Sequence, residues 1–245
     1  MTLGVNSEHL PVEGDHDSRP ACRIGAPGLF FAIALLAAVS ACSGSNDGDE
    51  SNKVNGSVHV AAGKPAATAA TVNGGIHIDA NAAVTNASTV NGGVALGDHA
   101  TATSLDSVNG SIKVGAGAHV SGTVTSVNGD LTLDEGAEVS GALTNVNGAI
   151  TLTAAHVAGG IKTVNGDMKI IGASHVEGGI FVEKSSTGLL QLGQNVPRIV
   201  IGPGATVQGE LRFQRKVQLY VSDKATIGVV TGATPIPFTG DSPPK

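Results

Sequence analysis

The chain has 245 residues, of which 35 are glycine, only 2% are aromatic and 14% are charged, and its net charge is −6. The acidic balance and the shortage of aromatic rings exclude the usual nucleic-acid binders, which need a basic surface or stacking platforms. A hydrophobic fraction of 41% excludes a disordered polymer, and glycine does not recur at every third position as in collagen. The core must therefore consist of small aliphatic side chains, which indicates thin, regular layers.

The first elements predicted along the chain are an export signal and a lipid anchor. Residues 28–39 form an uncharged apolar run behind Arg19 and Arg23, too short for a permanent membrane span but typical of a secretory signal. The sequence Val39-Ser40-Ala41-Cys42 that follows resembles the lipobox of bacterial lipoproteins. The resemblance implies cleavage before Cys42, acylation of Cys42 and, because Ser43 is not Asp, the outer membrane. We predict a signal peptide at 1–41 and a lipidated Cys42 with a flexible linker over 42–53. The alternative is a plain signal peptide with Cys42 as a bystander.

A repeat fills most of the remaining chain. The tripeptide Val-Asn-Gly occurs seven times, at spacings of 18 or 19 residues. The residues four and six positions after each of these valines are aliphatic, apart from one Met, and this alternation has the period of a β-strand. Two further short apolar segments follow in each repeat, as in Ala118-x-Val120 and Gly122-x-Val124. The pattern predicts an all-β fold, a single-stranded parallel β-helix of about ten coils, each with three strands and with the tripeptide valine inside.

The predicted β-helix covers residues 54–232. Residues 183–197 interrupt the rhythm and are expected to form a loop outside one coil. Residues 233–245 are expected to form a tail, either flexible or folded over the end as a cap. The mature aromatic residues, Phe181, Phe213, Tyr220 and Phe238, all lie in this last third and indicate where a cap or a contact belongs.

The asparagines of the tripeptide would align along the β-helix. Two interpretations are open: an amide ladder in which each side chain bonds the next coil, or turn residues with side chains in water. The positions are Asn55, Asn73, Asn91, Asn109, Asn128, Asn147 and Asn165.

The Val-Asn-Gly-x-Ile-x-Val coils, with segments such as Val176-Glu177-Gly178-Gly179-Ile180, resemble bactofilins and adhesin-type repeat domains. That resemblance implies a right-handed β-helix and a scaffold that polymerises end to end without nucleotide. Bactofilins are typically cytosolic, however, and an export signal departs from that pattern.

A row of metal-ligating side chains is the sharpest chemical candidate. Four histidines and one glutamate precede an aliphatic residue of the second strand, so we expect one row on five successive coils. Imidazole and carboxylate are ligands of Zn²⁺ and related ions. The alternative is an exposed polar face in which histidine is tolerated, and the pair His59 and His77 is interpreted in that way. The predicted row is His99, His119, Glu138, His156 and His175.

Enzymatic chemistry finds little support. Asp130 and Asp167 share a coil position but lie two coils apart, and sugar-stacking Trp is absent. The basic cluster at 212–216 is interpreted as solvated surface, with an anionic polysaccharide or lipid headgroups as the alternative partner. We expect a membrane-tethered scaffold or interaction module of the bacterial cell envelope, with self-association and envelope polysaccharide as partners and no nucleic acid. A surface adhesin or glycan-binding module is the second hypothesis and a polysaccharide-active enzyme the third. No catalytic residue and no cofactor are expected.

Overall fold

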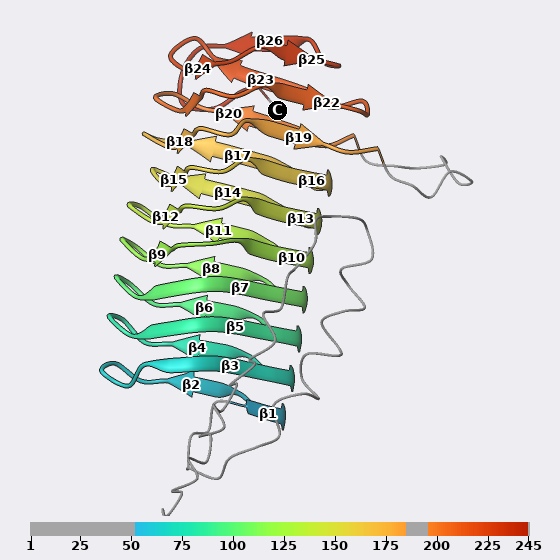
Figure 1. Ribbon diagram of the computed structural model, residues 1–245. Coiled ribbons are helices and arrows are strands. Elements are labelled where there is room, and N and C mark those ends of the chain that lie inside the picture. Colours follow the sequence, from blue (N-terminus) through green and yellow to red (C-terminus); the bar gives the residue numbers. More distant parts are fainter. Residues whose placement is uncertain (1–51, 185–195, 245) are drawn as a thin grey trace, which may run out of the picture.

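The structure is a computed structural model that describes residues 52–184 and 196–244. Within these ranges the protein is an all-β parallel solenoid of about ten turns without a helix, as predicted (Figure 1). No helix in the described part is therefore long and apolar enough to cross a membrane. The predicted signal peptide, Cys42 and most of the predicted linker lie outside the described residues, as does most of the predicted 183–197 loop.

Two parallel sheets form the walls of the solenoid. The smaller sheet stacks one strand from each coil: β2 (Val58–Val60), β4 (Ile76–Ile78), β6 (Val94–Leu96), β8 (Ile112–Val114), β11 (Leu131–Leu133), β14 (Ile150–Thr153), β17 (Met168–Ile171), β20 (Arg198–Ile201), β23 (Gln218–Ser222) and β26 (Pro235–Phe238).

The larger sheet begins as single strands and then divides into two columns. The single strands are β1 (Asn52–Asn55), β3 (Ala66–Asn73), β5 (Ala83–Asn91) and β7 (Thr101–Asn109). One column continues with β9 (His119–Val120), β12 (Glu138–Val139), β15 (His156–Val157), β18 (His175–Val176), β21 (Thr206–Val207) and β24 (Thr226–Ile227). The other continues with β10 (Val124–Asn128), β13 (Leu143–Asn147), β16 (Ile161–Asn165), β19 (Ile180–Val182), β22 (Leu211–Phe213) and β25 (Val230–Thr231).

The division of the larger sheet corrects the prediction of three strands in every coil. In β7 two residues separate the inward positions Ala102 and Leu105, and the chain runs through as one strand. In the next coil three residues separate the equivalent Val120 and Val124, and the additional residue interrupts the strand at Gly122. The change from an 18- to a 19-residue period is thus an insertion at this bend.

The core consists of columns of like side chains, one layer from each coil. Leu131 pairs with Ile112 on one side and with Ile150 on the other, and all three are at most 1% exposed. Fully burying one such side chain contributes about 1.5–3 kcal/mol. A column of this kind has room for aliphatic groups of similar size in every layer, which explains the shortage of aromatic residues.

The valine of the tripeptide was predicted to lie inside, and this is wrong. Val54 is 63% exposed and the later tripeptide valines are half-buried, because the inward position belongs to the residue before each valine. From the second tripeptide on, that residue is buried and polar: Thr71, Thr89, Ser107, Ser126, Asn145 and Thr163. Five of these side chains donate to a glycine carbonyl of the preceding coil, as Thr89 Oγ1 does to Gly74 O at 2.9 Å. The corner therefore satisfies its buried carbonyl groups from within.

The tripeptide asparagines form the amide ladder. Each Nδ2 donates to the Oδ1 of the equivalent asparagine one coil earlier, at 2.9–3.0 Å, from Asn165 down to Asn55. At the upper end Arg215 donates to the remaining Oδ1 of Asn165 and, at 2.8 Å, to the carbonyl of Val164. The ladder is thus continuous over seven coils and is closed by a guanidinium group.

The solenoid extends beyond its predicted end at residue 232. Within the predicted tail, β26 pairs with β23 and buries Phe238. The amide of Asp223 donates to the carbonyl of Phe238 at 3.0 Å, so Phe238 directs its backbone groups toward β23. Backbone groups alternate in direction along a strand, which leaves those of Pro235 and Pro237 at the outer edge. Because proline has no N–H, this edge lacks two donors that a further strand would need.

Candidate functional site

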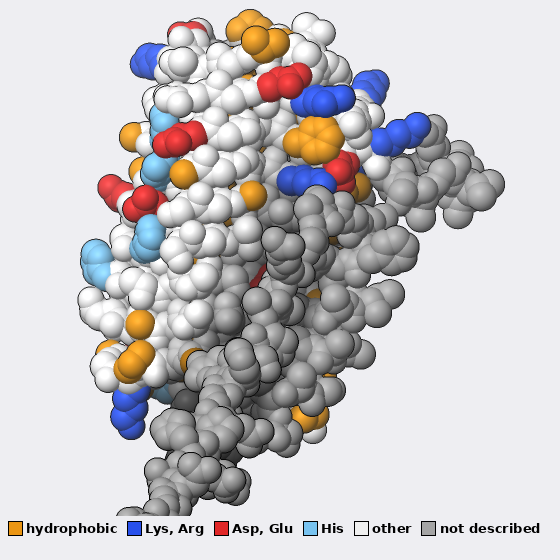
Figure 2. All heavy atoms as spheres, viewed as in Figure 1, with side chains coloured by type: hydrophobic (Ala, Val, Ile, Leu, Met, Phe, Trp, Pro, Cys, Tyr) orange, Lys and Arg blue, Asp and Glu red, His pale blue; other side chains and the backbone are white. Residues whose placement is uncertain are grey.

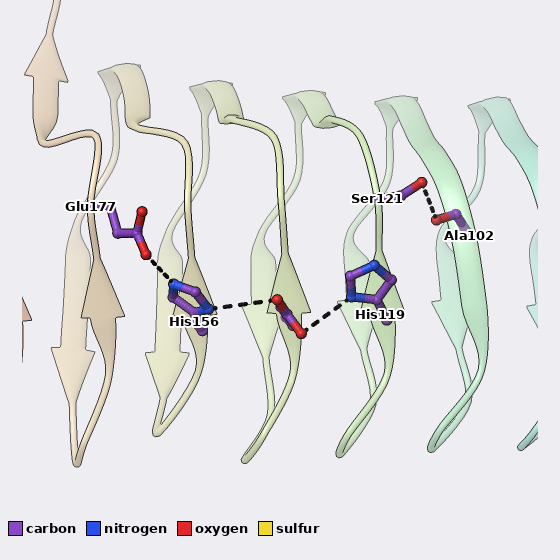
Figure 3. A network of polar contacts seen from close by, with 6 residues as sticks. Ala102, His119, Ser121, His156 and Glu177 are labelled. Carbon is purple, nitrogen blue, oxygen red and sulfur yellow. Dashed lines mark hydrogen bonds and ion pairs between the residues drawn. The ribbon is translucent and has the colours of Figure 1, made fainter.

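Four of the five side chains in the predicted row lie in one line, on the split column of the larger sheet (Figure 3). Glu138 pairs with His119 and with His156 on its two sides, and His156 pairs with His175. Glu138 lies 3.3 Å from His119 Nδ1 and 3.7 Å from His156 Nδ1, measured to its two carboxylate oxygens. These side chains are about half-exposed, so the row faces solvent.

His99 does not belong to this row. The strand partner of His119 is Thr101, and His99 lies two residues earlier in its coil, in a turn with φ of 56°. The equivalent turn residue in the next coil is Gly117, whose φ is 62°. The prediction aligned His99 through Ala100, but the inward residue that matches Val120 is Ala102. A separation of 20 residues from His99 to His119, longer than one coil, is the signal that the alignment was shifted.

Glu177, which was not among the predicted residues, adds a carboxylate to this row. Glu177 Oε1 accepts a hydrogen bond from His156 Nε2 at 3.0 Å, and the rings of His156 and His175 are 5.5 Å apart. One ligand atom from each of His156, His175 and Glu177 lies within 4.8 Å of the others, so these three side chains could hold one metal ion. The signal for Glu177 was the pattern His175-Val176-Glu177, because residues two apart on a strand share a face.

A second group of the same composition lies on the smaller sheet, where the sequence analysis expected only solvated surface. His59 and His77 are strand partners on β2 and β4, and Asp79 follows β4. Asp79 Oδ1 lies 2.7 Å from His59 Nε2 and 3.5 Å from His77 Nε2. The hydrogen bond from His59 lowers the pKa of the Asp79 carboxyl group, so this group is ionised at neutral pH.

The carboxylates considered for catalysis bond the backbone instead. Asp130 Oδ1 accepts the amide of Ala149 and Asp167 Oδ1 accepts the amide of Arg198, each at 2.8 Å and each from the next coil. Both groups therefore join coils at the same corner, and no side chain that could act as their acid or base partner adjoins them among the described contacts.

A shallow groove of about 350 Å³ crosses β13, β16, β19 and β22. Its rim carries Phe181, with Lys162 Nζ 6.0 Å from the ring centroid on one side and the Arg212 guanidinium 5.7 Å away on the other. These three residues are strand partners on neighbouring coils. Figure 2 shows on this face an apolar side chain between basic ones, with carboxylates nearby. The aromatic residues of this region were predicted to mark a cap or a contact, but the position of Lys162 beside Phe181 follows only from strand pairing.

Comparisons with protein-family models, with curated proteins and with solved structures found no match for the chain.

Proposed function

We propose that this protein is a membrane-tethered structural module of the bacterial cell envelope, held by a lipid on Cys42. The supporting observation is the position of the solenoid relative to the predicted anchor. Its first described strand begins at Asn52, ten residues after Cys42. Ten residues span at most about 35 Å. Ten coils spaced about 4.8 Å apart give a rod of about 45–50 Å, so the C-terminal end would project from the membrane.

We further propose that the C-terminal end contacts a second copy of the chain, in line with the resemblance to end-to-end bactofilin scaffolds. Val229 is 71% exposed, and Val221, Ile227 and Val230 pack on the core but are only half-buried. In the middle of the solenoid the equivalent layers are fully covered. Covering apolar surface of this kind lowers the free energy, which favours association. The missing donors of Pro235 and Pro237 disfavour a continuous ladder along the smaller sheet, so the contact would use apolar side chains and the edge of the larger sheet.

Sedimentation of the detergent-purified full chain over a range of concentrations tests self-association. We expect a concentration-dependent oligomer that Val229→Asp removes. Val54→Asp, a matched change of an exposed valine at the opposite end, identifies the other half of the contact. If both changes remove the oligomer, unlike ends meet; if only Val229→Asp does, two C-terminal ends meet. A wild-type chain that stays monomeric at every concentration refutes the contact.

A second candidate function is binding of an anionic polysaccharide in the groove beside Phe181. An aromatic ring offers a platform for the apolar face of a sugar, and the Arg212 guanidinium suits a carboxylate on the same chain, whereas Lys162 already pairs with Glu183 at 2.8 Å. The groove is open, which fits an extended polymer.

The test of this second function is retention of the protein on immobilised alginate, with neutral dextran as the comparison. We expect Phe181→Ala to abolish retention. Tyr220→Ala is the matched control, because Tyr220 also stacks against an arginine, Arg198, but lies on the other sheet and not in this groove. Equal retention of Phe181→Ala and wild type would refute this function.

A further inference from the structure

Two histidines and one aspartate converge on the outer face of the smaller sheet, at its N-terminal end. The parallel register places His59 directly beside His77, and their ring centroids are 5.6 Å apart. Asp79 is two residues beyond His77 and therefore lies on the same face. The group does not continue to the next coil, because the strand partner of His77 there is Ala95, which has no metal-ligating side chain. Strand pairing thus fixes the positions from which these three side chains extend.

The distances within this group suit a transition metal ion. Ligand atoms at 2.0–2.2 Å from a tetrahedral ion are about 3.3–3.6 Å from one another. The Asp79 Oδ1–His77 Nε2 distance of 3.5 Å already fits, and the Asp79 Oδ1–His59 Nε2 distance of 2.7 Å must lengthen by about 0.6–0.9 Å to reach that range. The third pair of ligand atoms also lies within 4.8 Å. His59 and His77 are largely exposed, so small rotations of their rings are sterically free.

The same coil position elsewhere shows why histidine matters here. Lys113 occupies the equivalent place two coils on, and its Nζ forms an ordinary ion pair with Asp134 at 3.0 Å. A protonated lysine has no lone pair to offer a metal ion, whereas neutral imidazole does. With histidine on two adjacent coils in place of lysine, the aspartate keeps a hydrogen-bond partner and the surface offers two nitrogen ligands.

We propose that His59, His77 and Asp79 bind one divalent transition metal ion of the Zn²⁺ class, with water completing the coordination. The ion joins the first two coils of the smaller sheet through side chains of both. This two-histidine, one-carboxylate arrangement occurs a second time on the larger sheet, at His156, His175 and Glu177, with the same order of ligands along the chain. The occurrence of this arrangement on two separate faces supports a metal-binding role for the three side chains over a chance pairing. The proposal is independent of anchoring and of self-association.

Equilibrium dialysis of the full chain against Zn²⁺ tests this site. We expect His77→Ala to lose one bound equivalent relative to wild type. Asp79→Asn should lower the affinity of this site for Zn²⁺ by more than about tenfold. Removing only a residue that supports a metal ligand already lowers the affinity by about 10- to 100-fold, and Asp79 is proposed as a ligand itself. His77 is 63% exposed and the hydrogen bond between His59 and Asp79 does not involve it, so His77→Ala should fold as wild type does.

His99→Asn is the matched control, since it removes an imidazole from a turn outside both groups and asparagine tolerates positive φ. This variant should bind as much Zn²⁺ as wild type. A His77→Ala chain with a wild-type circular dichroism spectrum and undiminished Zn²⁺ binding would overturn the proposal. Equal losses in His77→Ala and His99→Asn would overturn it as well, because binding would then be non-specific.

Discussion

The asparagine ladder makes a prediction that depends on position. Asn109 donates to Asn91 Oδ1 and accepts from Asn128 Nδ2, both at 3.0 Å, so Asn109→Ala removes two hydrogen bonds. At the lower end Asn55 takes part in one ladder bond, which it accepts from Asn73. One hydrogen bond contributes about 0.5–1.5 kcal/mol net, and exposure places these bonds in the lower half of that range. Asn109→Ala should therefore lower the free energy of unfolding by about 1–2 kcal/mol.

The comparison variants separate the ladder from a role in the turn. Asn55→Ala should cost about half as much as Asn109→Ala, because it removes one ladder bond. Asn165→Ala should cost at least as much as Asn109→Ala, since Asn165 donates to Asn147 and accepts from the charged Arg215. The ladder asparagines have no positive φ, so alanine adds no backbone strain at any of them. Urea unfolding followed by circular dichroism gives all three values. Equal losses for Asn55→Ala and Asn109→Ala would refute the ladder as the source of stability.

Three other changes test the walls of the solenoid by the same urea assay. A Cβ at Gly129 would lie 2.2 Å from the carbonyl oxygen of Gly110, so Gly129→Ala should lower the free energy of unfolding by more than about 2 kcal/mol. Gly75→Ala should be tolerated, because the nearest atom to its Cβ would be 3.4 Å away. Equal costs for the two changes would contradict the close approach at Gly129. Thr89→Val keeps the shape but removes the hydroxyl that bonds Gly74 O, at a cost of about 1–3 kcal/mol, and a neutral result would show that this carbonyl has another partner. Burial raises the pKa of Asp106, although hydrogen bonds from Thr125 and Ser104 oppose the shift. The contribution of Asp106 to stability is therefore present below the unfolded pKa of about 3.9 and is lost as the pH rises through the folded pKa. Asp106→Asn should accordingly stabilise the protein at pH 7 but not at pH 3.5. A stabilisation of equal size at both pH values would contradict the raised pKa.

The period of the repeat was sufficient to predict the solenoid and the alignment of the asparagines. Strand alternation after each tripeptide identified the buried positions of the smaller sheet, such as Leu131 and Leu133, because two-residue periodicity there is uninterrupted. It failed at the corner before the tripeptide, where the inward residue is polar. Hydropathy alone assigned that place to valine, whereas hydrogen bonds to glycine carbonyls account for Thr71 and four of its equivalents.

The candidate sites were less predictable because they depend on neighbours from other coils. His99 was assigned to the wrong row, since an 18-residue period does not show at which bend a coil gains or loses a residue. His59 lies one coil before His77 and Asp79, and their convergence follows only once β2 and β4 are known to pair in register. Phe181 acquired its flanking cations from β16 and β22 in the same way.

A structural module tethered to the envelope requires a lipid on Cys42, so the chemical state of this residue decides whether the tether exists. The full-length protein would be expressed in a bacterium and extracted from membranes, and its N-terminal tryptic peptide would be weighed by mass spectrometry. We predict a peptide covering 42–53 that carries a diacylglyceryl group on sulfur and an acyl chain on the new amino terminus, and a Cys42→Ala chain that lacks both and leaves the membrane fraction. An unmodified Cys42, or a Cys42→Ala chain that is still anchored, would contradict the account.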